Sequence, residues 1–184
     1  MFARSTRTLV GVATIAIVLL AAPSPANAGA ADLSTARAAT ARFHQVGEAT
    51  TAGYGEFRDA GKIACIETPG VGVMGIHYVN GGLVGDGSVN AATPEALVYQ
   101  PLPNGNLRLV AVEYIVFYSM WAGASKPSLF GQEFKLVGST NRYGIPAFYE
   151  LHAWVWQNNP SGMFKDWNPS GSCANSTRGY PVPN

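Results

Sequence analysis

The three histidines of the chain, together with one glutamate, are the residues whose types and positions could do chemistry. His44, His77 and His152 each fall within an expected helix or strand rather than a loop. Glu113 falls within a strand that is apolar on both faces, where an unpaired carboxylate is costly. Imidazole nitrogens and carboxylate oxygens are ligands of zinc, copper, iron and manganese. We therefore predict a metal site of His77, His152 and Glu113, with His44 as a fourth member and zinc or copper as the ion.

The same residues allow other functions. A metal-free version is a small polar pocket for a small ligand, in which Glu113 is hydrogen-bonded to a histidine or a tyrosine. An enzyme could use Glu113 and a histidine as an acid/base pair. A third alternative is a structural or cell-wall-interacting protein without a pocket, in which Trp121 and Trp167 stack on a sugar or simply pack. The leading hypothesis is a small exported binding protein with a His/Glu-lined pocket, and no residue is assigned a catalytic role.

Two other motifs fail for lack of structural context. Residues 70–75, GVGVMG, match the dinucleotide pattern GxGxxG, but a proline precedes them and a strand-like segment follows, where that site needs a strand and then a helix. Residues 86–90, DGSVN, begin like a calcium loop, but its sixth and twelfth positions are Ala91 and Leu97 instead of Gly and Glu. The patterns GxSxG, HExxH and SxxK are absent. No organic cofactor is predicted.

One helix and about five strands must position these residues. Apolar side chains recur at three- and four-residue steps over residues 32–57, which predicts a helix from about Leu33 to Tyr54. Asn104-Gly105 predicts a hairpin turn. The strands are expected at residues 71–79, 96–100, 107–118, 130–137 and 147–157. The predicted fold class is α+β, with one long N-terminal helix packed on an antiparallel sheet or partly closed barrel.

The first 28 residues have the pattern of a secretory signal peptide. Arg4 and Arg7 precede an apolar run from Leu9 to Ala22, and Ala26-Asn27-Ala28 has small residues where a signal peptidase cleaves. There is no Arg-Arg pair, so we expect Sec-type export to a secreted or cell-envelope location. Residues 29–184 then form a single globular domain, in which no segment could cross a membrane.

Charge and cysteine content narrow the partners. Removing Arg4 and Arg7 with the leader takes the twelve basic residues to ten, against eleven acidic residues. No basic stripe is present, so nucleic acid is not an expected partner. Cys65 and Cys173 are an even pair in an exported chain and predict a disulfide. A redox or metal site of two thiols is the alternative, without the usual CxxC spacing. Substrate and oligomeric state are left open.

Several blocks of the sequence carry a resemblance. GVMGIHYVN, PEALVYQP, LVAVEY, LFGQEF and above all HAWVWQNNPSGMFKDWNPSGSC, residues 152–173, resemble the blocks of a family of exported bacterial proteins without an established activity. The resemblance extends over roughly residues 38–173. It implies export and a single domain, and it implies no activity, cofactor or catalytic residue.

Overall fold

A computed structural model describes residues 25–176 of the chain. Residues 1–24, which hold most of the predicted signal peptide, lie outside the described residues, and the cleavage point predicted after Ala28 falls inside the first helix. Within residues 25–176, no helix is both long enough and apolar enough to span a bilayer.

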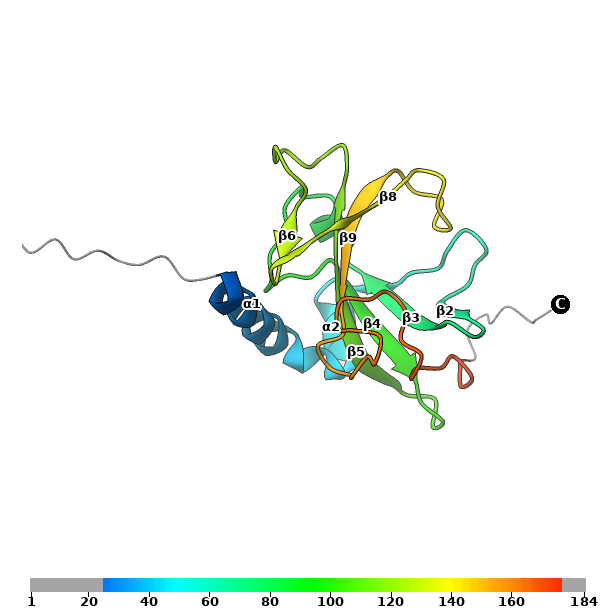
Figure 1. The fold of residues 1–184 in the computed structure, drawn as a ribbon. Coiled ribbons are helices and arrows are strands. Elements are labelled where there is room, and N and C mark those ends of the chain that lie inside the picture. The colour runs from blue at the N-terminus through cyan, green and yellow to red at the C-terminus, as the bar shows by residue number, and fades with distance from the viewer. Residues whose placement is uncertain (1–24, 177–184) are drawn as a thin grey trace, which may run out of the picture.

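The described residues form mainly antiparallel sheet (Figure 1). Seven strands make the principal sheet in the order β1-β3-β4-β5-β9-β8, with β2 also paired to β3. These strands are β1 (Gly55–Glu56), β2 (Cys65–Thr68), β3 (Gly72–Val79), β4 (Ala96–Pro101), β5 (Leu107–Phe117), β8 (Lys135–Val137) and β9 (Phe148–Ala153). A separate hairpin joins β6 (Ser128–Leu129) to β7 (Gln132–Glu133). The helices are α1 (Pro25–Thr40), a 3-10 turn η1 (Ala41–His44), α2 (Val46–Thr51) and α3 (Gly81–Val84).

The predicted α+β fold class is wrong. The structure has nine strands among its described residues, and only α1, with 16 residues, is a helix of appreciable length. The principal sheet is not closed into a barrel, because its order ends at β1 and β8. The described part of the chain is therefore a mostly antiparallel β structure with a few short helices.

The single helix predicted over residues 32–57 is divided because tertiary contacts compete with helix geometry. α1 ends at Thr40, and Gln45 has extended backbone angles, φ −94° and ψ 109°. The Tyr99 hydroxyl donates to the Phe43 carbonyl at 2.7 Å, and the indole of Trp156 donates to the Thr40 hydroxyl at 3.1 Å. These contacts hold the turn at residues 40–44 against the sheet, and the regular helix is interrupted there.

The strands predicted from the sequence are confirmed in part. The Asn104-Gly105 hairpin is confirmed, since it joins β4 to β5 and Gly105 has a φ of 79°. The strand expected over residues 130–137 is confirmed only in part, as β7 and β8, because Phe130 and Gly131 both have positive φ and turn the chain between β6 and β7. The strand expected over residues 147–157 ends at Ala153.

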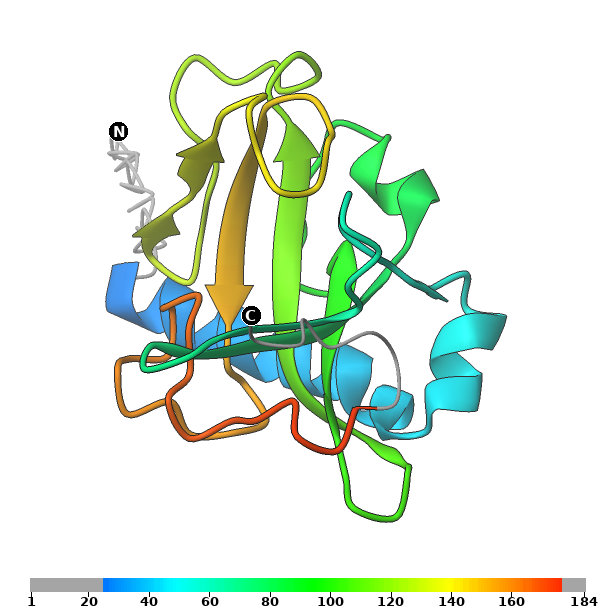
Figure 2. The same cartoon turned by 90° about the vertical axis from the view of Figure 1, so that its right-hand side faces the viewer.

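The sheet is sharply curled, and glycine makes the curl possible. Gly75 in β3 has a φ of 101°, and a Cβ there would lie 2.8 Å from the carbonyl oxygen of Tyr99. Register shifts occur at Ile66/Glu67 in the β2–β3 pair and at Val98/Tyr99 in the β4–β5 pair. Bulges of this kind bend a strand and increase its twist. Figure 2 shows β2 and β3 crossing in front of β5 and β9, with α1 behind them.

Two apolar clusters occupy the two faces of the curled sheet. The larger one joins the helices to the sheet and includes Phe43, Leu97, Tyr99, Tyr114 and Val116. The smaller one is built from Val84, Ala96, Ile115 and Phe148, with partly buried neighbours around them. The concave face thus has its own small core.

A disulfide joins Cys65 on β2 to Cys173, as the sequence predicted. The two residues are 108 positions apart, and a bridge that closes a loop of this size stabilises a fold by roughly 4 to 5 kcal/mol in the chain-entropy model. It fixes the C-terminal segment against the edge of the curled sheet.

The helical layer gives a test of the packing. Phe43 is 4 % exposed and lies edge-on to Tyr54, with ring centroids 5.3 Å apart. Phe43→Ala should lower the free energy of unfolding by about 3 to 5 kcal/mol, because it leaves a cavity under the helices. Denaturant melts measure this change. Tyr118→Ala is the matched control: Tyr118 is 55 % exposed, so its loss should be below about 1 kcal/mol. Equal losses would contradict the packing.

Candidate functional site

Three of the four predicted ligands meet on the concave face of the sheet. His77 comes from β3, Glu113 from β5 and His152 from β9. One ligand atom from each lies within 4.8 Å of the others, and all three side chains are buried. Within residues 25–176, this is the one group of three or more His, Cys, Asp or Glu residues that could hold a metal ion.

Strand register and sheet curl together assemble this group. Glu113 and His152 are direct cross-strand partners in the β5–β9 pair. His77 is three strands away from His152 in the sheet order, which in a flat sheet is roughly 14 Å. The two imidazole centroids are nevertheless 5.8 Å apart. The intervening strand β4 places Ala96 opposite Glu113 and Val98 opposite His77, and these small side chains leave room for the group.

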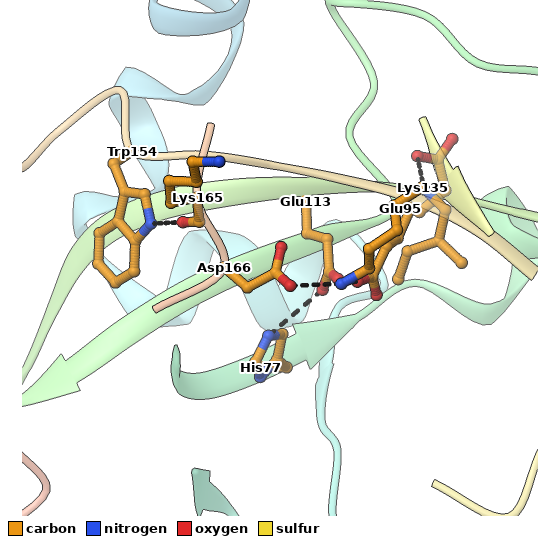
Figure 3. Close-up of polar contacts among 9 residues, drawn as sticks. His77, Glu95, Glu113, Lys135, Trp154, Lys165 and Asp166 are labelled. Carbon is orange, nitrogen blue, oxygen red and sulfur yellow. Dashed lines mark hydrogen bonds and ion pairs between the residues drawn. The ribbon is translucent and has the colours of Figure 1, made fainter. Parts of the chain in front are cut away.

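The polar atoms of this group are close together and yet largely unsatisfied. His77 Nε2 lies 3.3 Å from Glu113 Oε2 (Figure 3), an ion-pair distance without the direction of a hydrogen bond. Both ring nitrogens of His77 and both of His152 have no hydrogen-bond partner among the described residues. Buried polar atoms are normally hydrogen-bonded, so four unpartnered nitrogens in one place need an explanation.

His44 is not part of this group. It lies in η1 on the helical side, is exposed, and packs edge-on against Trp156 with ring centroids 4.5 Å apart. His44 was expected on the flank of one long helix, but the division of that helix turns its side chain toward the Trp156 indole. The predicted fourth ligand is therefore corrected to a surface residue.

Three charged residues that were not predicted from the sequence extend the group. Glu150 lies two residues before His152 on the same face of β9, and its Oε1 is 2.5 Å from Lys135 Nζ. The lysine also contacts Asp166, the contact drawn in Figure 3. The spacing of Glu150 and His152 was a usable signal, since alternate residues of a strand share a face. Lys135 and Asp166 had no such signal.

Burial and neighbouring charges shift the pKa values of Glu113 and Glu150 in opposite directions. Burial alone would raise the pKa of Glu113, but the contact with His77 and the nearby His152 outweigh it and lower that pKa to about 2. Burial and the charge of Glu113 raise the pKa of Glu150 to about 8, although Lys135 opposes this. Burial also lowers the pKa of His152 to about 4. At neutral pH, Glu113 is therefore ionised and His152 is neutral, the states in which each binds a metal.

A further buried carboxyl, Glu95, has a structural role. Its Oε2 accepts the backbone N–H of Ile115 at 2.9 Å and so extends the β4–β5 ladder past the end of β4. Burial raises the pKa of Glu95 to about 8. It is 1 % exposed.

Hydrogen bonds hold the C-terminal loop that carries Asp166. The Trp154 indole donates to the Lys165 carbonyl at 2.7 Å, and Asn159 donates to the carbonyls of Lys165 and Trp167. Asn168 makes a backbone bridge with Val73 on β3. Trp154 also stacks on His152, with ring centroids 5.2 Å apart. The loop is thus a fixed wall beside the histidine.

Two cavities border the group from opposite sides. One, of about 440 Å³ and called the polar cavity here, is lined by charged and polar side chains that include Lys135, Glu150 and His152, together with some apolar ones such as Phe164. The other, of about 420 Å³, is mostly apolar and has His77 and Glu113 in its wall. The buried polar row therefore separates a polar cavity from an apolar one.

Comparisons with protein-family models, curated proteins and solved structures found no match to this chain. The predicted membership of a family of exported proteins remains a prediction.

The raised carboxyl pKa values predict how stability depends on pH in metal-free protein. Glu95 and Glu150 titrate near 8 when folded and near 4.5 when unfolded, so their contribution is complete below about 4.5 and is lost as the pH rises through 8. His152 acts in the opposite sense, reducing stability as the pH falls from 6.5 toward 4. Stability should therefore decline from about pH 6.5 to 8.

Chemical denaturation at a series of pH values measures this decline. Glu150→Gln should remove about half of the slope between pH 6.5 and 8, and Glu95→Gln with Glu150→Gln should remove nearly all of it. A double variant that keeps the wild-type slope would show that neither carboxyl holds a proton in the folded state.

Proposed function

We propose that the protein binds one divalent transition-metal ion, zinc or copper, through His77, Glu113 and His152. The observation that carries the proposal is the convergence of these three buried side chains, with ligand atoms within 4.8 Å of one another and four imidazole nitrogens without hydrogen bonds. An ion would bind one nitrogen of each ring and compensate the buried carboxylate.

The donor set and its spacing fit a three-residue site with an open position. Two imidazoles and one carboxylate are a common ligand set for zinc that keeps a further position for water or a ligand. Tetrahedral zinc with bonds of about 2.0 to 2.1 Å sets its ligand atoms about 3.4 Å apart. Ligand atoms that lie within 4.8 Å of one another would therefore move together by up to about 1.4 Å. A closed site needs a fourth protein ligand, and the group of His77, Glu113 and His152 supplies three.

The energetics favour an ion over an empty polar pocket. Leaving a buried polar group unpaired costs roughly 1 to 3 kcal/mol, and this cluster contains several. Ligation removes that cost for the coordinating nitrogens and neutralises Glu113. A metal-free pocket would need other donors, and the described neighbours do not supply them to the histidines.

One observation favours a second candidate, an enzyme with an acid/base pair. Glu113 and Glu150 lie close together with pKa values of about 2 and about 8, so one carboxyl is ionised and the other protonated near neutral pH. Such a separation is typical of paired catalytic acids and bases. Turnover of model esters or glycosides that is lost in both Glu113→Gln and Glu150→Gln would support this role.

We place this binding function outside the cytoplasm, in a secreted or cell-envelope protein. The signal-peptide pattern of residues 1–28 and the Cys65–Cys173 disulfide support that location. Membership of the exported family that the sequence blocks resemble would agree with it.

Metal titration tests the proposal directly. Protein purified without an affinity tag should bind one zinc ion per chain, and His152→Ala should weaken zinc binding by at least about 100-fold, since even indirect changes around such sites cost 10- to 100-fold. Isothermal titration with zinc and copper, together with elemental analysis, measures both quantities. His77→Ala should behave in the same way.

His44→Ala is the matched control. His44 is exposed and packed on Trp156, so its removal should leave zinc affinity unchanged. Circular dichroism checks that each variant is folded. Weak uptake that is equal in wild type, His152→Ala and His44→Ala would contradict a metal site at the buried group.

A further inference from the structure

The apolar cavity beside the metal-ligand group has the form of a small-molecule site. Its volume of about 420 Å³ falls within the range of ligand pockets, roughly 300 to 1,000 Å³. Most of its wall is hydrocarbon, supplied by residues from α3, three strands and a loop: Val79, Val84, Ile115, Phe117, Ile145 and Phe148. An apolar body would fit such a space.

The wall of this cavity is fixed by a clasp between two loops. Asp59 and Arg142 form an ion pair through Arg142 Nη2 and Nε, at 2.7 and 3.2 Å, and the Arg142 carbonyl accepts the N–H of Ala60. The clasp brings Phe57 beside Tyr143, with ring centroids 6.0 Å apart. Both rings line the cavity, so its shape exists before any ligand binds.

The polar end of the cavity determines which polar group a bound molecule would need to carry. His77 and Glu113 are the buried polar members of its wall. A divalent ion held by two neutral imidazoles and one carboxylate keeps a net charge of +1. An uncompensated charge next to a hydrocarbon wall is costly, and an anionic oxygen donor in the open coordination position cancels it.

We propose that this cavity binds a small apolar molecule with one anionic oxygen donor, of the class of a medium-length aliphatic carboxylate. The carboxylate oxygen binds the metal at His77 and Glu113, and the hydrocarbon body fills the space between α3 and the clasped loops. This inference rests on the metal site proposed above and adds the class of ligand that the site takes.

Octanoate, 1-octanol and acetate are the probes. Octanoate should bind zinc-loaded protein with one molecule per chain, at least tenfold more tightly than it binds metal-free protein. It should also bind at least tenfold more tightly than 1-octanol, which lacks the anionic donor, and than acetate, which lacks the apolar body. Isothermal titration measures each affinity, on samples whose zinc content has first been determined.

Variants that narrow the cavity separate the ligand site from the metal site. Val84→Phe should weaken octanoate binding at least tenfold while zinc affinity stays at the wild-type value, and Ile145→Trp is a second narrowing variant in a loop. The control, Ser161→Phe, narrows the polar cavity on the other side and should change neither affinity.

The outcomes distinguish the two proposals. If the protein binds zinc but not octanoate, the ligand class is overturned and the metal site is retained. The same holds if octanoate affinity is unchanged both by zinc loading and by the variants that narrow the cavity. A loss of octanoate binding in Ser161→Phe alone places the ligand in the polar cavity and also overturns it. Absence of zinc binding overturns both proposals.

Discussion

The burial of Glu113 is the constraint on which the arrangement of the concave face depends. A carboxylate in the middle of a central strand loses its water, and only close positive or hydrogen-bonding partners offset that loss. Its cross-strand partner His152 is supplied by register alone, whereas His77 reaches it only because β3 curls over the sheet. Gly75, the register shifts and the small side chains of β4 all serve that approach. The contact of Glu113 with the two histidines therefore depends on the backbone geometry of the sheet.

The curl also explains why the polar groups form a row between two cavities. Glu150 and Lys135 continue from His152 toward the polar cavity, while His77 and Glu113 border the apolar one. The charge changes along this row: ionised Glu113 is followed by protonated, uncharged Glu150 and then by the cationic Lys135, which Asp166 also contacts. The disulfide and the Trp154 hydrogen bond hold the C-terminal loop that closes the polar side. An ion at the ligand group would be accessible from a hydrocarbon space and shielded by this loop.

The sequence predicted which polar residues converge better than it predicted the fold, for physical reasons. Glu113 was identifiable because a charged residue interrupts an apolar strand, and His77 and His152 because they occur within strands. The divided helix could not be predicted, because hydrogen bonds from Tyr99 and Trp156, which are distant in sequence, dock the turn at residues 40–44. β1 and β2 were missed because they are short, and the break at Phe130 depends on a positive φ at a non-glycine residue. The position of His44 was lost together with the helix.

X-ray absorption spectroscopy at the zinc edge, on the zinc-loaded protein, tests the metal site most directly because it reports the ligands themselves. The account predicts two imidazole nitrogens at about 2.0 to 2.1 Å, with their outer-shell scattering, and oxygen donors at about 2.0 to 2.2 Å, with no sulfur. The imidazole contribution should fall to one ring in His77→Ala. A spectrum of oxygen ligands without imidazole scattering would contradict a metal centre built on the curled sheet.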